Sequence, residues 1–297
     1  MPLSPRRALP VMFASALLLA GCGASTGDPP GDDGKRAGAP PGDPAGLSKD
    51  GVRITAWGGG GEGGDDEQSP AAVEFEVTNR EAEPFTYTVT FDFLSDSGGV
   101  LENARQVVPA VGPGRTVAST VGIPTTRPDS RDRPQVRIGK VRRVPTDEAP
   151  TGSGPCPASG VQLMADDGEA AMGLRVVGLR LTNCGTDAYH IEGYPSLGLL
   201  DEERQPVRGV RIVDGSGGVA TVSGFDAPPR PVSLRPGETA SAGLMWRNTT
   251  GSGVAANVPY VRVAAKPGAP PVVVTPELDL GTTGRLGVSA WKKEPAR

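Results

Sequence analysis

The sequence is poor in the side chains on which most enzymes and metal centres depend. It contains one histidine, His190, and three cysteines among 297 residues. A Ser-His-Asp triad would have to use His190, with Asp187 and Ser196 nearby in sequence, and no Gly-x-Ser-x-Gly segment supplies its nucleophile. A tetrahedral zinc site needs more nitrogen and sulfur ligands than the chain offers. We therefore expect that the protein is not an enzyme and has no catalytic residue, metal or cofactor.

An excess of either charge is also missing. The chain has 30 basic and 34 acidic residues, which leave a formal net charge of -4. Proteins that bind nucleic acids carry a basic surface that compensates the phosphate backbone. We therefore expect no nucleic-acid partner.

No stretch of the sequence is apolar over the length of a transmembrane helix. The most apolar run, residues 11–20, follows two arginines and has the layout of a secretory signal. It leads into the residues LAGC at 19–22, which resemble the bacterial lipobox. That resemblance implies a signal peptide over residues 1–21 and a diacylglyceryl group on Cys22. The alternative is an ordinary signal peptide that is followed by an incidental cysteine.

The segment after the lipobox has almost no large apolar side chains. Residues 22–50 are rich in Gly, Pro and charged residues, so they cannot bury enough surface to offset the entropy of ordering. We expect a disordered tether with a span of about 30 Å. Two or more acyl chains hold a protein stably on a bilayer. The expected location is therefore the extracytoplasmic face of the cell membrane, with a lipid anchor on Cys22.

Apolar and polar side chains alternate with period two over residues 51–144. The clearest example is the segment 85–93, in which Phe, Tyr and Val alternate with Thr and Asp. Such alternation predicts half-buried strands with an aromatic face turned inward. Glycine and proline clusters separate these segments at the spacing that is typical of a β-sandwich.

A Pro- and Gly-rich linker is expected over residues 145–155, followed by a second domain over 156–291 and a tail over 292–297. Apolar spacing of 3.6 residues is absent outside the signal peptide, so the fold class is all-β, with two Ig-like β-sandwich domains in tandem. In the second domain we expect strands at residues 176–182, 196–200, 207–213, 219–222, 239–246, 260–265 and 272–275.

Two short patterns occur once in each predicted domain. Residues 77–79 (VTN) correspond to 181–183 (LTN), and 113–116 (PGRT) corresponds to 236–239 (PGET). Proline fixes φ and glycine accepts a positive φ before a new strand, so shared turn chemistry explains the correspondence as well as duplication does.

The second domain resembles a known family across its whole length. The residues that carry the resemblance are Cys156, the LTNC segment at 181–184, the Gly-Tyr-Pro element at 193–195 and the LRPGETA segment at 234–240. The family is domain-of-unknown-function family 4232, typical of secreted and lipid-anchored proteins of actinobacterial type. The resemblance implies an Ig-like sandwich with a disulfide and no established activity.

Once Cys22 is lipidated, two thiols remain in an exported chain. An even remainder in an oxidising compartment predicts a disulfide between Cys156 and Cys184, and two buried free thiols are the alternative. A loop of this length gives about 3.5 kcal/mol of stabilisation in the chain-entropy model. The absence of a Cys-x-x-Cys segment makes this a structural bridge.

The sequence indicates the other candidate sites less strongly. Tyr194 either fixes a tight turn or contacts a partner through its ring. Copper binding by Met164, Met172, Met245 and His190 is a less favoured alternative to packing of the methionines in the core. Calcium binding by the acidic residues 65–67 or 166–167 is a less favoured alternative to solvated loops.

The sequence favours a non-enzymatic binding or structural module of the cell envelope whose partner is an envelope protein or a cell-wall glycan. The first rival is an envelope hydrolase that uses His190 or a carboxylate pair. The second is a metal-delivery module.

Overall fold

The computed structural model describes residues 44–58, 72–95, 97–122, 135–152 and 154–295. Cys22, the predicted signal peptide, most of the predicted tether and the acidic residues 65–67 lie outside these ranges. Within them the helices are two short 3-10 turns, η1 Pro44–Leu47 and η2 Thr146–Glu148. Neither turn has the length or apolar character needed to cross a membrane. All other regular structure is β-strand, so the all-β prediction is confirmed.

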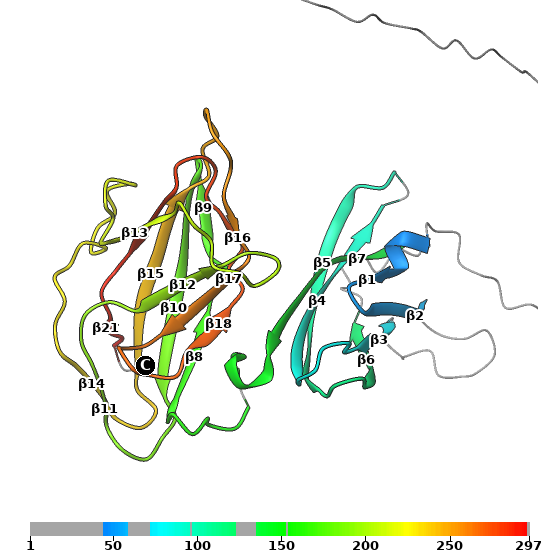
Figure 1. Ribbon diagram of the computed structural model, residues 1–297, viewed down its shortest axis with the longest axis horizontal. Coiled ribbons are helices and arrows are strands. Elements are labelled where there is room, and N and C mark those ends of the chain that lie inside the picture. The colour runs from blue at the N-terminus through cyan, green and yellow to red at the C-terminus, as the bar shows by residue number, and fades with distance from the viewer. Residues whose placement is uncertain (1–43, 59–71, 96, 123–134, 153, 296–297) are drawn as a thin grey trace, which may run out of the picture. The chain divides into compact units, whose positions relative to one another are not determined.

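The strands between residues 48 and 145 form two sheets, shown blue to green in Figure 1. The first sheet contains, in spatial order, β1 (Ser48–Lys49), β2 (Val52–Gly58), β3 (Ala72–Thr78) and β6 (Thr116–Gly122). The second contains β5 (Val100–Val111), β4 (Phe85–Leu94) and β7 (Gln135–Pro145). Apolar side chains from both sheets meet in one core, as in a sandwich.

Strand β4 supplies the aromatic face of this core. Its burial alternates at every residue, and the inward positions are the predicted aromatic and valine residues of segment 85–93. The rings of Phe75 on β3 and Phe91 on β4 lie 4.8 Å apart and join the two sheets. Full burial of one such ring stabilises the fold by about 1.5–3 kcal/mol.

The strands after residue 160 build a second core. Its largest sheet has the order β13–β20–β15–β10–β8, with β9 beside β10 and β21 beside β15. These strands are β8 (Val161–Ala165), β9 (Glu169–Ala171), β10 (Leu174–Asn183), β13 (Arg211–Asp214), β15 (Thr239–Arg247), β20 (Arg285–Val288) and β21 (Lys292–Lys293). The pair β13–β20 is parallel, and the other pairs are antiparallel.

A three-stranded sheet and two short ribbons complete this part of the chain. The sheet has the order β12 (Ser196–Leu200), β17 (Tyr260–Ala264) and β18 (Val272–Val274). The ribbons pair β11 (Tyr189–Ile191) with β14 (Val232–Leu234), and β16 (Asn257–Val258) with β19 (Leu278–Asp279). Buried side chains of these elements and of the large sheet form one apolar cluster that includes Trp246 and Trp291.

A buried asparagine closes the turn after β3. Asn79 is 0% exposed, and its Nδ2 donates to the carbonyl oxygens of Glu83 and Val111, both at 2.8 Å. Its Oδ1 accepts from the backbone N–H of Glu81 at 2.9 Å. Its own carbonyl accepts from the N–H of Gly114, which has a φ of +65° in the turn before β6. One side chain therefore holds three segments together.

The same unit occurs at the end of β10. Asn183 is 1% exposed, and its Nδ2 donates to the carbonyl oxygens of Asp187 and Leu234, both at 2.8 Å. Its Oδ1 accepts from Gly185 N–H at 3.0 Å, and its carbonyl accepts from Gly237 N–H. The local partners lie two and four residues after the asparagine in both units, whereas the distant carbonyl lies 32 residues away from Asn79 and 51 from Asn183. The VTN and LTN patterns therefore mark one hydrogen-bonded unit that is built twice.

Several predicted boundaries differ from the structure. The last residues of the predicted tether are ordered: β1 pairs with β2, and Leu47 packs against the first core. Strand β7 and turn η2 occupy the first residues of the predicted linker, where Ala149 is buried. The predicted tail begins with β21, which pairs with β15. In each case a few backbone hydrogen bonds or one apolar contact outweighs a loop-like composition.

The prediction of a strand at residues 219–222 is wrong. Residues 216–231 contain turns at 216–218 and 223–226 and irregular segments, and Gly215, Gly217 and Gly218 adopt positive φ. The carboxylate of Asp226 accepts hydrogen bonds from the backbone N–H and the hydroxyl of Ser216 and closes this loop. A local valine pattern is too weak to form a strand beside three such glycines.

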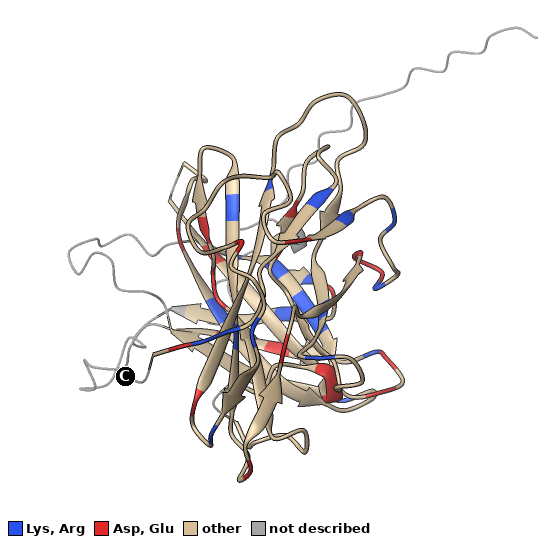
Figure 2. Cartoon of the chain, turned by 90° about the vertical axis from the view of Figure 1, so that its left-hand side faces the viewer, with Lys and Arg blue, Asp and Glu red and all other residues tan. Residues whose placement is uncertain are grey.

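Charged side chains of both signs are interspersed over the strands and loops (Figure 2). Most of the ion pairs are at the surface, where each contributes little to stability.

Candidate functional site

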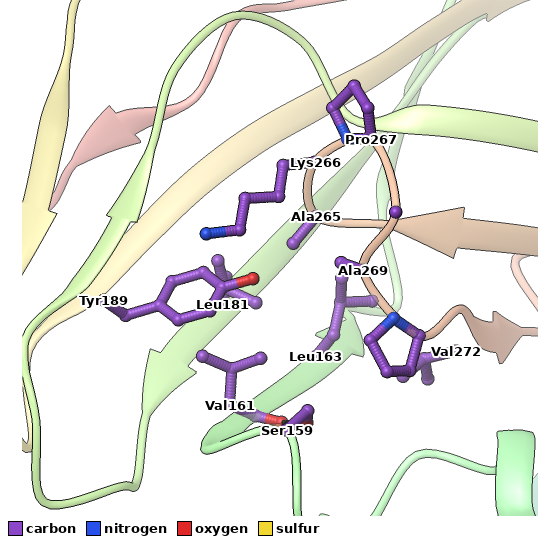
Figure 3. Close-up of a pocket in the computed structure, with 12 residues that line it drawn as sticks. Ser159, Val161, Leu163, Leu181, Tyr189, Ala265, Lys266, Pro267, Ala269 and Val272 are labelled. Atoms are coloured by element: carbon purple, nitrogen blue, oxygen red, sulfur yellow. Dashed lines mark hydrogen bonds between the residues drawn. The ribbon is translucent and has the colours of Figure 1, made fainter.

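A pocket of about 270 Å³ lies beside the edge strand β8. Its wall is built from β8, the end of β10, the start of β11 and the loop that joins β17 to β18 (Figure 3). Segments more than 100 residues apart in sequence therefore meet here. The lining residues are Ser159, Val161, Leu163, Leu181, Tyr189, Ala265, Lys266, Pro267, Gly268, Ala269, Pro270 and Val272.

The floor of the pocket is apolar. Val161 and Leu163 point inward from β8, and Leu181 comes from the neighbouring β10, where it pairs with Leu163. All three side chains are at least nine-tenths buried and belong to the second core. The floor is therefore a rigid part of the core that remains open on one side.

Tyr189 and Lys266 form the polar end of the pocket, where Figure 3 shows them side by side. The Lys266 ammonium lies 4.4 Å from the centre of the Tyr189 ring. Its Nζ also donates to the carbonyl oxygen of His190 at 2.9 Å. Burial raises the pKa of Tyr189 above its usual value, so the phenol is neutral at physiological pH. The ring thus offers its face to a cation and keeps its hydroxyl proton.

The loop between β17 and β18 is stiff. Pro267 and Pro270 fix two φ angles, Gly268 takes a φ of +78°, and the N–H of Ala269 donates to the carbonyl of Lys266. Trp291 Nε1 donates to the carbonyl of Ala265 at 2.9 Å and ties the loop to the core. The backbone of Lys266 is therefore fixed by the contact of Ala265 with the core before it and by the turn after it.

The disulfide between Cys156 and Cys184 secures the opposite wall, and its prediction is confirmed. The backbone N–H groups of Cys184 and Gly185 both donate to the carbonyl of Gly160. These bonds hold the segment that carries Ser159 and Val161 against the end of β10. The bridge is thus part of the frame of the pocket.

Lys266 is the only charged residue that lines the pocket. Its ammonium makes no ion pair with any described residue. A second hollow is lined by Lys266 together with His190, Glu192 and Ser233, among others. The pocket therefore combines an apolar floor with one positive charge that has no carboxylate partner among the residues described.

The structure places the residues of the hydrolase hypothesis on different elements. His190 is exposed on β11, opposite Ser233 on β14. Ser196 lies on β12, opposite Ala264, and the carbonyl of Asp187 is used by Asn183. Within the described ranges, no hydrogen bond joins the His190 imidazole to a hydroxyl or a carboxylate.

The methionine prediction is partly wrong. Met245 is buried, but Met164 is 41% exposed on β8 and Met172 is 98% exposed at the turn between β9 and β10. Met172 has a φ of +44° in a two-residue turn, and such a turn leaves no core beside its tip. Across the described residues, no three His, Cys, Asp or Glu side chains gather as metal ligands.

Asp166 has a structural role. Its Oδ1 accepts hydrogen bonds from the N–H groups of Gly168 and Gly178 and so closes the turn after β8. Asp167 is exposed and pairs with Arg105 at 3.1 Å.

Tyr194 is half-buried between β11 and β12, next to the buried Pro195. Gly193 before it has a φ of +85°, and its carbonyl accepts from Trp291 N–H at 2.9 Å. The Gly-Tyr-Pro element thus forms the turn that carries the chain from β11 to β12. The partner contact of Tyr194 stays a prediction.

Sequence reasoning missed Lys266 and Tyr189. The sequence signal for Lys266 is a lysine followed by PGAP, which predicts a rigid turn but no pocket. Tyr189 lies one residue before the single histidine, and only the pairing of β11 with β14 turns its ring inward.

Sheets of this kind around an apolar core define an all-β, sandwich-like protein. Residues 156–292 match a family described as a domain of unknown function (DUF4232), so a domain of this family is present in the second half of the chain. No curated protein matches the sequence.

Proposed function

We propose that the protein is a lipid-anchored protein of the extracytoplasmic face of the cell membrane, and that it acts there as a non-enzymatic binding module. The observation that carries the location is the apolar run at residues 11–20 followed directly by LAGC, with Cys22 as the acylated residue. The Cys156–Cys184 disulfide supports export, because disulfides persist in oxidising compartments.

The finer architecture is part of this proposal. Two Ig-like sandwiches in tandem are supported by the two apolar cores and by the repeated unit around Asn79 and Asn183. In such folds the loops at the sandwich ends and the exposed sheet edges contact partners.

The pocket supports binding rather than turnover. Its one hydroxyl besides the tyrosine, Ser159 Oγ, donates to the carbonyl of Val161 and makes no hydrogen bond to a basic side chain in the described structure. An apolar floor with few polar groups is typical of ligand-binding sites. The proposed partner is a component of the cell envelope, either a protein or a cell-wall glycan.

Metabolic labelling with an alkyne-bearing fatty acid tests the anchor. In a bacterial host with lipoprotein processing, we expect the parent chain to carry the label and sediment with the membranes. Cys22→Ser should lose the label and leave the membrane fraction. Cys156→Ser/Cys184→Ser is the matched control, because it removes cysteines and should keep the label. An unlabelled parent chain with an intact N-terminal methionine would contradict the proposal.

A further inference from the structure

Among the described residues that line the pocket beside β8, one carries a positive charge and none a negative charge. An ammonium has three donors, of which Lys266 uses one for the His190 carbonyl at 2.9 Å, while the Tyr189 ring lies against its side. Glu192 lines the neighbouring hollow, yet it makes no ion pair with Lys266. Donor capacity at the pocket mouth is therefore left for an anion.

The remainder of the wall suits an apolar group. The floor residues Val161, Leu163 and Leu181 are buried, and Pro270 and Val272 also line the pocket. Transfer of an aliphatic group from water to this floor therefore favours binding. The volume of about 270 Å³ limits the guest to a short chain or a single side chain.

We propose that this pocket binds a carboxylate carried by a short apolar group, with the carboxylate on Lys266 and the apolar part on the β8 floor. The proposal rests on the proposed binding role and names the ligand chemistry of the same site. A phosphate ester carries about two charges and three acceptor oxygens and is best held by several donors. One lysine and no arginine line this pocket, which favours a singly charged carboxylate.

Titration of the full chain carrying Cys22→Ser with hexanoate, followed by amide NMR shifts, tests the proposal. We expect saturable shifts at Val161, Leu163, Tyr189 and Lys266. Hexylamine has the same length and the opposite charge, and it should shift none of them.

Three variants separate charge from shape. Lys266→Met keeps the apolar stem and should weaken hexanoate binding about tenfold, the effect of one charge-assisted hydrogen bond. Lys266→Glu should bind hexylamine instead. Lys292→Met, which removes an exposed lysine on β21 outside the pocket, should bind hexanoate like the parent.

A second arm distinguishes the two sources of such a carboxylate. A tripeptide that ends in leucine is compared with its C-terminal amide and with free hexanoate. Stronger binding of the acid peptide than of hexanoate assigns the site to peptide C-termini, and the reverse order assigns it to free alkanoates. Equal binding of hexanoate and hexylamine, unchanged binding by Lys266→Met, or no shift with any probe would overturn the proposal. Each of these results leaves the fatty-acid labelling of Cys22 unaffected.

Discussion

At the scale of single residues, Asn79 and Asn183 have the same part in the two cores. Each is almost fully buried, and its side chain joins its own turn to a distant segment, through four hydrogen bonds at Asn79 and three at Asn183. A buried polar side chain is costly unless all its groups have partners, and here they do. Such a residue tolerates almost no substitution.

Replacement of Asn183 by alanine should lower the free energy of unfolding by about 3 kcal/mol, because the carbonyls of Asp187 and Leu234 lose their side-chain donor and the Gly185 N–H loses one of its two acceptors. Asn183→Asp should also destabilise, since the carboxylate cannot donate to those carbonyls. Urea unfolding followed by tryptophan fluorescence measures both. The exposed Asn103→Ala is the control and should change stability by less than about 0.5 kcal/mol. An Asn183→Ala loss as small as the control's would refute this account.

At the scale of elements, the disulfide connects the segment before β8 to the end of β10. It encloses a loop with a sequence separation of 28 residues, and Gly160 accepts two backbone hydrogen bonds at the same place. The bridge therefore restrains the unfolded chain and also keeps the pocket wall in position.

The double variant Cys156→Ala/Cys184→Ala should be less stable by about 3.5 kcal/mol. Thermal or urea unfolding with and without a reductant checks this. The parent with reductant should approach the variant, whereas the variant should not respond to the reductant. A variant that unfolds at the same urea concentration as the oxidised parent would show that the bridge adds no stability.

At the scale of the whole molecule, a charge network links the residues before position 150 to those after it. The Arg142 side chain is 13% exposed and makes two hydrogen bonds each to the carboxylates of Glu277 and Glu202. Lys140 adds a second cation 3.1 Å from Glu277. Nearby, the Arg204 guanidinium lies 4.5 Å from the centre of the Phe85 ring. These contacts join the two parts of one compact unit.

The pKa of Glu277 has two opposing influences. Burial raises it, but the hydrogen bond and charge of Arg142, together with Lys140, outweigh burial and hold it below the ordinary value of 4.5. A carboxylate with a lowered pKa in the folded state contributes stability above its unfolded pKa. That stability is lost as the pH falls through the folded pKa.

We therefore expect Glu277→Gln to reduce the acid sensitivity of the protein. Between neutral pH and about pH 3, the free energy of unfolding of the parent should fall more than that of the variant. Urea unfolding at a series of pH values measures the difference. Glu203→Gln, at an exposed residue in the turn after β12, is the control. Its free energy of unfolding should decrease with falling pH as much as that of the parent. Parallel pH curves for the parent and Glu277→Gln would contradict this expectation.

Much of the fold followed from local patterns. The alternation at residues 85–93 predicted β4, and five of the seven strands expected after residue 156 overlap closely with β10, β12, β15, β17 and β18. Weakly alternating strands such as β5, and short ones such as β11 and β14, were not predicted. Cross-strand pairing stabilises these elements more than their own sequence does.

The candidate site was much harder to predict. Tyr189, Lys266 and Leu163 carry no shared motif, and each is an ordinary residue in its own segment. They meet only because β11 pairs with β14 and because the rigid turn after β17 places Lys266 in the same pocket as the first residues of β8. The prediction that Met164 and Met172 pack in the core failed for a related reason, since local sequence does not say which side of a strand or turn faces the core.

The sequence by itself determined the all-β class, the pairing of its two remaining cysteines and the expectation of export, because periodicity, thiol number and an N-terminal signal are local properties of the chain. The tertiary structure alone decided that a lysine without an ion pair to any described residue lies at the mouth of an apolar pocket, and that two asparagines hold equivalent turns. Those features depend on distances between residues far apart along the chain, which are set only when the sheets pair and the cores close.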